Sequence, residues 1–343
     1  MIKNALLGNT PVVRLEHLIE SNVYAKLEYY NPTFSVKDRA AYNMVTEAIN
    51  RKKIKKGDTL IEATSGNTGL GICYAAIQYG LNVICTVFDD VPIEKINLLK
   101  GFGATVIVCP SSYESSSPQG YVGVAKRIAS EMENCYYVDQ FNNYDNVMAH
   151  YKYTGPELYE QMNKKIDYLF ATIGTGGTIS GLGKYLKEKN NNIKIIGVEP
   201  VGGIYKKYFY GKALHYTDHL IQSISDDFIS NNFYKEYVDE VIQVEDVDSF
   251  SMCYEILRTE GLSIGTSGGC VVAAVKKYCN KNNIEEDKNI VCIIPDCGLK
   301  YMDTLFNQEY LNKHNLQECS KKQIDDLKLK EYIYANGYDV TIV

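Results

Sequence analysis

The sequence lacks three features that would each point to a class of protein. It has no C-x-x-C pair, no apolar run of membrane-spanning length and no stripe of clustered lysine and arginine. The first absence argues against a zinc ribbon or a thioredoxin-like redox site. The second argues against a membrane-spanning helix, and the third against binding to a nucleic-acid backbone. We therefore expect no nucleic-acid partner, no membrane association and no metal site.

What remains is an ordinary globular composition. The 343 residues are 45% hydrophobic and 23% charged with a formal net charge of −6, and this length is enough for two domains that share a cleft. The segment 1–8 is too short and too soon interrupted for a signal peptide, so we expect a soluble cytoplasmic protein. Ten cysteines lie scattered through apolar segments, which predicts that most are reduced core residues.

Short apolar or β-branched runs alternate with helical patterns along the chain. The segment 69–80 is apolar, contains small residues and ends in glycine, as a buried helix does. Such alternation predicts an α/β fold with parallel strands joined by helices. The predicted strands are 59–62, 82–87, 105–108, 168–172, 193–198 and 290–294.

Three segments carry groups suited to chemistry. Lys37 stands at a predicted helix start, where a partly desolvated amine could form a Schiff base. The loop 62–69, Glu-Ala-Thr-Ser-Gly-Asn-Thr-Gly, joins a predicted strand to a helix and suits an anion such as a carboxylate. The loop 174–178, Gly-Thr-Gly-Gly-Thr, has three glycines that let the backbone wrap a phosphate. Taken singly, each has an ordinary alternative: a solvated lysine, a capped turn and a glycine turn.

Together these segments resemble the cysteine synthase and cystathionine β-synthase family of fold-type II pyridoxal-phosphate (PLP) enzymes. The resemblance extends over about residues 5–305 and keeps its motifs in the family's order. The matching stretches are 8–11, 26–28, 31–32, 35–39, 64–69, 150–151, 155–157, 174–178 and 197–200.

The resemblance implies an α/β fold like that of the tryptophan synthase β-subunit. Two three-layer α/β domains would enclose a cleft for pyridoxal 5'-phosphate. The large PLP-binding domain is expected in residues 1–40 plus 147–310, and a smaller, mobile substrate-binding domain in residues 41–146. Residues 311–343 would form a C-terminal extension.

The resemblance also implies roles for single residues. Lys37 would hold the cofactor and act as the base at Cα, and Asn67 would hydrogen-bond the ring hydroxyl. Cys297 stands where the family is expected to place a hydroxyl against the pyridine nitrogen, and a thiol is a weaker hydrogen-bond partner. The substrate carboxylate is assigned to Thr64, Ser65, Thr68 and Gln140, and the phosphate to Gly174, Thr175, Gly176, Gly177 and Thr178.

One departure from the family pattern concerns the second substrate. Ser223-Ile-Ser225, followed by Asp226-Asp227, stands where the family has Gly-Ile-Gly. The added hydroxyls and carboxylates indicate a polar second substrate or an activated water, with Ser223 and Asp226 as candidate contacts. The alternative is a surface loop that touches no ligand.

The implied activity is β-replacement on a serine- or cysteine-type amino acid through an aminoacrylate intermediate, carried out by a homodimer. Two alternatives change the nucleophile: desulfhydration of L-cysteine would release sulfide, and amine addition would give a 2,3-diaminopropionate-type product. A non-catalytic, PLP-binding regulatory protein is a more distant alternative. It predicts erosion of Lys37 or of the two loops, and these are intact.

Two further segments carry local signals. His215 and His219, with Asp218 between them, have the i, i+4 spacing of a metal pair on a helix, but a surface or gating segment is favoured because no third ligand stands nearby. Asn336-Gly337 lies between alternating apolar residues and predicts a hairpin in 332–342.

Overall fold

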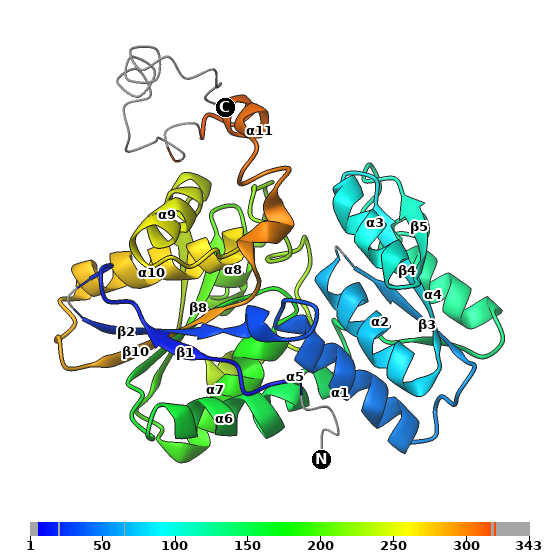
Figure 1. Ribbon diagram of the computed structural model, residues 1–343, viewed down its shortest axis with the longest axis horizontal. Coiled ribbons are helices and arrows are strands. Elements are labelled where there is room, and N and C mark those ends of the chain that lie inside the picture. Colours follow the sequence, from blue (N-terminus) through cyan, green and yellow to red (C-terminus); the bar gives the residue numbers. More distant parts are fainter. Residues whose placement is uncertain (1–5, 20, 65, 317–318, 320–343) are drawn as a thin grey trace, which may run out of the picture.

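The computed structural model describes residues 6–19, 21–64, 66–316 and 319. These residues form two lobes, each built on its own sheet (Figure 1). Within them the larger sheet has six strands, in the order β1 (Val12–Arg14), β2 (Asn22–Leu27), β10 (Asn289–Ile294), β7 (Tyr168–Thr172), β8 (Lys194–Pro200) and β9 (Glu240–Val244). The smaller sheet has four, in the order β5 (Thr105–Cys109), β4 (Asn82–Phe88), β3 (Thr59–Ala63) and β6 (Cys135–Tyr137).

Every strand pair in both sheets is parallel except β1 with β2. Parallel neighbours need crossover connections, and helices supply most of them. The α-helices of the described residues are α1 (Lys37–Asn50), α2 (Asn67–Tyr79), α3 (Ile93–Gly101), α4 (Tyr121–Glu131), α5 (Tyr144–Ala149), α6 (Gly155–Gln161), α7 (Gly177–Lys189), α8 (Tyr205–Phe209), α9 (Asp246–Thr259), α10 (Thr266–Asn282) and α11 (Gln308–Lys313). A π-helix, η2 (His150–Thr154), joins α5 to α6, and short 3₁₀ turns occur at η1 (Glu28–Tyr30), η3 (Lys235–Tyr237) and η4 (Gly298–Tyr301).

Helices cover both faces of each sheet, so each lobe has three layers. Along β10 the side chains of Ile290, Cys292 and Ile294 join the core under α9 and α10, whereas Val291 and Ile293 join the core under α6 and α7. This alternation follows from the pleat of a strand. In the smaller lobe, α1, α2 and α3 pack on one face and α4 on the other.

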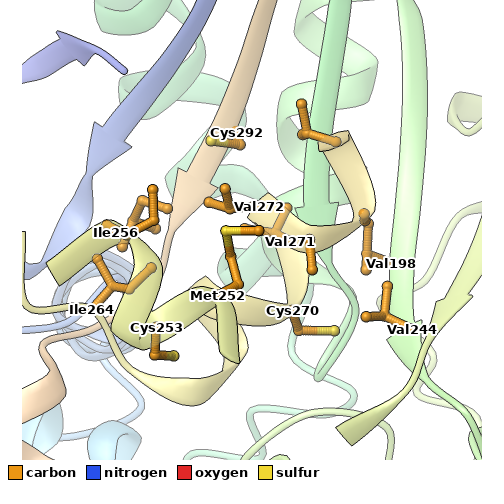
Figure 2. Packing of buried hydrophobic residues seen from close by; sticks show 14 of the residues in the cluster. Val198, Val244, Met252, Cys253, Ile256, Ile264, Cys270, Val271, Val272 and Cys292 are labelled. Atoms are coloured by element: carbon orange, nitrogen blue, oxygen red, sulfur yellow. The ribbon is translucent and has the colours of Figure 1, made fainter. Parts of the chain in front are cut away.

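The core between the larger sheet and α9 and α10 contains several of the cysteines. Figure 2 shows Cys253, Cys270 and Cys292 among valine, isoleucine and methionine side chains. All ten cysteines lie in the described residues, all are free, and eight are buried. The prediction of reduced core cysteines is therefore confirmed.

The six predicted strands correspond to β3, β4, β5, β7, β8 and β10, and the predicted helix 69–80 to α2. The α/β fold with two three-layer lobes is thus confirmed. The smaller sheet lies within the predicted segment 41–146, but the division into domains stays a prediction, as does the mobility of the smaller one. The hairpin predicted in 332–342 lies outside the described residues. Among the described residues, no helix combines the length and the apolar character needed to cross a membrane.

Candidate active site

The predicted cofactor lysine begins α1 beside the ends of the central strands. The Val36 N–H donates to the Pro295 carbonyl at 2.8 Å, and the Asp38 carboxylate accepts from the Thr33 N–H at 2.6 Å. These bonds fix the chain on both sides of Lys37. Its amine lines two adjoining cavities, which we call together the central cavity because both are also lined by Asn67, Thr175 and Ser223.

Burial lowers the pKa of the Lys37 amine, while the carboxylates of Asp296 and Asp226 oppose that shift. A lysine with a lowered pKa has a larger neutral, nucleophilic fraction near neutral pH. This environment suits an amine that bonds to a carbonyl carbon.

The loop 174–178 connects the end of β7 to α7 and forms one end of the central cavity. Gly176 has φ +79°, a conformation that favours glycine, and a Cβ on Gly177 would lie 2.0 Å from Asn146 Oδ1. The 13-residue helix α7 starts at Gly177, so its first N–H groups face this end. A helix N-terminus of this kind binds phosphate.

Two asparagines that the sequence analysis missed join the predicted loops. Asn146 Nδ2 donates to the Gln140 carbonyl at 2.9 Å and to Thr175 Oγ1 at 3.0 Å. Asn232 Nδ2 also donates to the Gln140 carbonyl, at 2.8 Å. The phosphate-type loop and the carboxylate-type loop are therefore parts of one hydrogen-bonded frame. No local sequence pattern signals either asparagine, because each bonds at least one residue far away in the chain.

His150 contacts the 174–178 loop through the Thr178 side chain. Its ring nitrogens lie 3.1 Å from Thr154 Oγ1 and 3.2 Å from Thr178 Oγ1. Burial, with the positive charges of Arg39 and Lys37, lowers the pKa of His150 to about 3. A neutral imidazole thus holds the Thr178 hydroxyl, and it does so from a π-helical turn, a feature common at functional sites.

The loop after β3 forms the side of the cleft contributed by the smaller lobe. Thr64 Oγ1 accepts from the N–H groups of Gly66 and Gly69 at 3.0 and 3.3 Å. Thr68 Oγ1 donates to Gln140 Oε1 at 2.5 Å, and both residues line the central cavity with Lys37. Thr64 faces the outer part of the cleft. The structure therefore brings Thr64, Thr68 and Gln140 together, while Ser65 lies outside the described residues.

One predicted cofactor contact is not among the residues that line the central cavity. Of the described residues, Ser267 and Asp296 line it, and Cys297 does not. Cys297 instead pairs through its backbone with Ile264, at an isolated β-bridge. The assignment of Cys297 to the pyridine nitrogen stays a prediction, and Ser267, at the start of α10, is a hydroxyl that lines the cavity. Its position comes from the packing of α10 against β10 and has no signal in the local sequence.

The Ser223–Asp227 segment lies at the cleft. Ser223 has φ +66°, an uncommon conformation for a non-glycine residue, and it lines the central cavity. Asp226 lines the same cavity beside Lys37 and Tyr121. Burial and the neighbouring Asp227 raise the pKa of Asp226 to about 6, against the lowering effect of Lys37. Asp227 is exposed and accepts from Ser115 Oγ at 3.2 Å.

A second, outer cavity of about 470 Å³ opens next to the first and shares Ser223, Asp226 and Tyr121 with it. It is also lined by Asp90, Lys95, His219 and Asp303. Burial lowers the pKa of the Lys95 amine to about 8. This cavity carries groups of both charge signs.

The histidine pair does not lie on a helix. Residues 212–219 contain no helix, so the i, i+4 spacing of His215 and His219 does not place them on one helical face. His219 Nε2 lies 3.1 Å from the Ser225 carbonyl. Across the described part of the chain, no group of three or more potential metal-binding side chains occurs.

The residues around the central cavity fit pyridoxal phosphate. The N-terminus of α7 is suited to bind the phosphate group. The Lys37 amine is suited to bond with the aldehyde, and the Asn67 amide to hydrogen-bond with the ring hydroxyl. Asp296, which also lines the cavity, is 1% exposed and its Oδ1 has no hydrogen-bond partner among the described residues. A buried polar atom without a partner is unusual and is consistent with a polar ligand nearby.

Comparison with known proteins agrees with this geometry. Residues 4–296 match the family model of pyridoxal-phosphate dependent enzymes. The chain is 38% identical over 323 residues to cystathionine beta-synthase of Saccharomyces cerevisiae, covering 91% of this chain and 64% of that protein. It is 35% identical over 314 residues to cysteine synthase of Buchnera aphidicola, covering 90% of this chain and 96% of that protein.

The crystal structure of O-ureido-L-serine synthase superposes with a TM-score of 0.83 at 25% identity, covering 95% of this chain and 97% of that one. The chain thus spans less than two thirds of the yeast relative and nearly the whole of the other two proteins. It belongs to the family of pyridoxal-phosphate-dependent enzymes that includes cysteine synthase and cystathionine β-synthase.

Proposed function

We propose that this enzyme exchanges the β-substituent of a serine- or cysteine-type amino acid. The supporting observation is that the Lys37 amine meets the 64–69 loop and the 174–178 loop around one cavity. Bound there, pyridoxal phosphate supplies an electron sink for the carbanion formed at Cα. The phosphate belongs at Gly174, Thr175, Gly176, Gly177 and Thr178.

Lys37 removes the Cα proton of the substrate and later returns it to the product. Its lowered pKa makes the neutral amine available as a base near neutral pH. The substrate carboxylate is proposed to bind at the start of α2, at the first N–H groups of that helix and beside Thr68, which lines the central cavity with Lys37. Ser65 stays a candidate from the sequence alone. Gln140 orients Thr68 through the 2.5 Å hydrogen bond between their side chains.

Asp226 is the proposed base for the incoming nucleophile. With a pKa of about 6 it is mostly ionised at neutral pH and can accept a proton from water or an amine. The same negative charge disfavours hydrosulfide, which is already an anion. A neutral protic nucleophile therefore fits this site better than sulfide does.

With L-cysteine as donor and water as nucleophile, the Cβ–S bond breaks and a Cβ–O bond forms. The products are L-serine and hydrogen sulfide, so the atoms balance without a further reactant. An amine in place of water gives a 2,3-diaminopropionate-type product by the same steps.

A second candidate is an amino-acid thiol as nucleophile, as the name cystathionine beta-synthase of the yeast relative suggests. The outer cavity favours it, because about 470 Å³ exceeds what water needs. Lys95 there could bind a carboxylate, and Asp90 or Asp303 an ammonium group. This candidate uses the same donor chemistry and differs only in what enters the cleft.

The deciding experiment supplies the holoenzyme with L-cysteine alone in water enriched in heavy oxygen. Release of sulfide together with serine that carries the label at its hydroxyl supports water as the nucleophile. Sulfide release that requires an added thiol amino acid, with formation of the thioether, supports the second candidate. Absence of reaction with L-cysteine, L-serine, O-acetylserine and O-phosphoserine would contradict β-replacement.

The role of Asp226 is tested separately with Asp226→Asn. We expect the second half-reaction to slow by about 100-fold, in the range of general-base effects, while the cofactor absorbance still responds to L-cysteine. The rate of the parent enzyme should rise as the pH increases through about 6, and the rate of Asp226→Asn should not show this rise. Asp227→Asn is the matched control, because that neighbouring carboxylate is exposed; since Asp227 raises the pKa of Asp226, its loss should shift the pH dependence to lower pH without abolishing it. Equal effects of both substitutions would argue against Asp226 as the base.

The resemblance supports three further proposals. The enzyme is proposed to be a cytoplasmic homodimer, and its smaller lobe to move as a substrate-binding domain. Light scattering of the purified protein measures its mass, and protease protection by an amino-acid substrate tests closure of the cleft.

A further inference from the structure

Both polar atoms of the Asn67 side-chain amide are hydrogen-bonded to charged groups of the larger lobe. Asn67 Nδ2 donates to Asp296 Oδ2 at 2.7 Å, and Lys300 Nζ donates to Asn67 Oδ1 at 2.8 Å. Asn67 begins α2 in the smaller lobe, whereas Asp296 and Lys300 follow β10 in the larger one. Turning the amide over would place its donor at an ammonium and its acceptor at a carboxylate. Only one orientation is therefore favoured.

Both charged groups are themselves fixed. Lys300 Nζ also donates to the Thr33 carbonyl at 2.6 Å. Asp296 Oδ2 also accepts from the Tyr301 hydroxyl at 2.7 Å, and Tyr301 is 1% exposed. Ordered, charge-assisted partners of this kind hold an amide more firmly than solvent does.

The arrangement leaves capacity for a ligand. An amide nitrogen has two hydrogens, and one of those on Asn67 is taken by Asp296. Asn67 lines the central cavity, as Lys37 does. The second hydrogen can therefore serve a polar group in that cavity, while the Lys300 ammonium is bound to the amide oxygen.

The titratable groups around Lys300 come from several elements. Asp296 follows β10, Asp38 lies in α1, and Cys297 precedes Lys300 in the chain. Lys95 of α3 adds a second positive charge, with its amine 4.8 Å from the centre of the Tyr301 ring. Burial lowers the pKa of Lys300, and Asp296 and Asp38 oppose this shift.

We propose that Lys300 and Asp296 are positioning residues that aim the Asn67 amide at the ring hydroxyl of the cofactor, with Lys300 favouring the ionised form of that hydroxyl. The inference rests on the proposed role of Asn67, but it does not depend on which nucleophile enters the cleft. Lys300 itself does not touch the substrate in this arrangement. It acts through Asn67.

The test uses the absorbance of the holoenzyme without substrate. The cofactor form with an ionised ring hydroxyl absorbs at longer wavelength than the neutral form, so the ratio of the two bands reports their balance. Lys300→Met should lower this ratio by a factor on the order of ten, the size expected when a charge near the ring is lost in a partly buried site. Lys300→Arg, which keeps the charge, should restore most of it.

Two controls keep the test interpretable. Lys194→Met removes an exposed lysine at the far end of β8 and should leave the ratio unchanged. Circular dichroism and the cofactor dissociation constant separate loss of fold or of cofactor from a change at the ring. Lys300→Gln provides a second neutral variant if Lys300→Met does not fold.

Asn67→Ala separates the inference from its premise. If Asn67→Ala leaves the ratio unchanged, the proposed contact of Asn67 with the ring hydroxyl is wrong. If Asn67→Ala lowers the ratio but Lys300→Met and Asp296→Asn do not, the positioning role is overturned. Neither result affects the sulfide-release experiment, which tests β-replacement by its products.

Discussion

His150 is a buried histidine held between two threonine hydroxyls. Its folded-state pKa of about 3 lies below the ordinary value of 6.5, because burial and nearby positive charges disfavour the imidazolium. The unfolded chain therefore binds a proton at pH values where the folded chain does not. His150 contributes stability fully above about pH 6.5 and progressively less as the pH falls toward 3.

We expect this residue to lower the free energy of unfolding by about 1.4 kcal/mol for each pH unit below 6.5. Urea unfolding at pH 7 and pH 5 should show a smaller pH dependence for His150→Asn than for the parent, by about 2 kcal/mol over this interval. His215→Asn, which removes an exposed imidazole, should keep the parental pH dependence. An unchanged slope in His150→Asn would mean that the imidazole is not held neutral.

At the same scale, the sequence motifs picked out Lys37 and the two loops that the structure brings together around the central cavity, but they did not pick out Ser267. Lys37 and both loops lie in motifs whose spacing along the chain carries their chemistry. Ser267 has no such motif, and it reaches the cavity only because α10 packs across the end of β10. Lys300 and Asn146 were missed for the same reason, since each bonds a residue more than twenty positions away, Asn67 and Thr175 respectively.

At the scale of elements, the start of α7 is crowded. A Cβ on Gly177 would lie 2.0 Å from Asn146 Oδ1, far inside contact distance, although the backbone there has no strained φ. The same asparagine donates hydrogen bonds to the Thr175 hydroxyl and the Gln140 carbonyl. Position 177 must therefore lack a side chain for the loop to keep this conformation. Asn146 needs the same space to form its hydrogen bonds.

Gly177→Ala should displace Asn146 and weaken pyridoxal phosphate binding by at least about ten-fold, the effect of losing roughly 1.4 kcal/mol of positioning. Cofactor titration of the apoenzyme measures this change. Gly101→Ala is the matched control, because Gly101 ends α3 with nothing within 4 Å of an added Cβ. Cofactor affinity equal to the parent in Gly177→Ala would show that the loop can open without cost.

Strand prediction succeeded for six strands, including β3 and β8 that each contain at least one charged residue, and failed where tertiary partners decide the structure. β2 contains Lys26, a charge that breaks its apolar pattern, yet the Lys26 side chain is fully buried. Its amine donates to the Thr10 carbonyl at 2.7 Å and to Gln161 Oε1 at 2.6 Å, and it pairs with Glu157. None of these partners is visible in the local sequence, so β2 could not be predicted from it.

At the scale of the whole molecule, a buried ion network joins the N-terminal strands to α1 and α6. Glu157 forms salt bridges with Lys26 and Arg39, at 2.5 and 2.8 Å, and Arg39 forms another with Glu28 at 2.7 Å. Although burial raises the pKa of Glu157, Arg39 and Lys26 lower it to about 2. The carboxylate therefore stabilises the fold fully above about pH 4.5 and loses this effect as the pH falls toward 2.

Glu157→Gln should lower the free energy of unfolding by about 3 kcal/mol, because it leaves two buried cations with less compensation. Glu160→Gln, one turn further along the chain, removes a side chain that is 65% exposed and pairs with Lys164 at 3.5 Å. That change should cost less than about 0.5 kcal/mol. Denaturant unfolding of both variants at pH 7 measures the difference, and similar losses would argue against a special role for the buried network.

The pairing of β2 with β10 has a consequence for how the molecule is made. Residues 22–27 align with residues 289–294, so the centre of the larger sheet needs both ends of the described chain. The smaller sheet needs only residues 59–137. Since a chain leaves the ribosome from its N-terminus, the smaller lobe can fold while the first strands still wait for their partner. During synthesis the cleft is therefore completed last, by the strand that delivers Asp296 and Lys300.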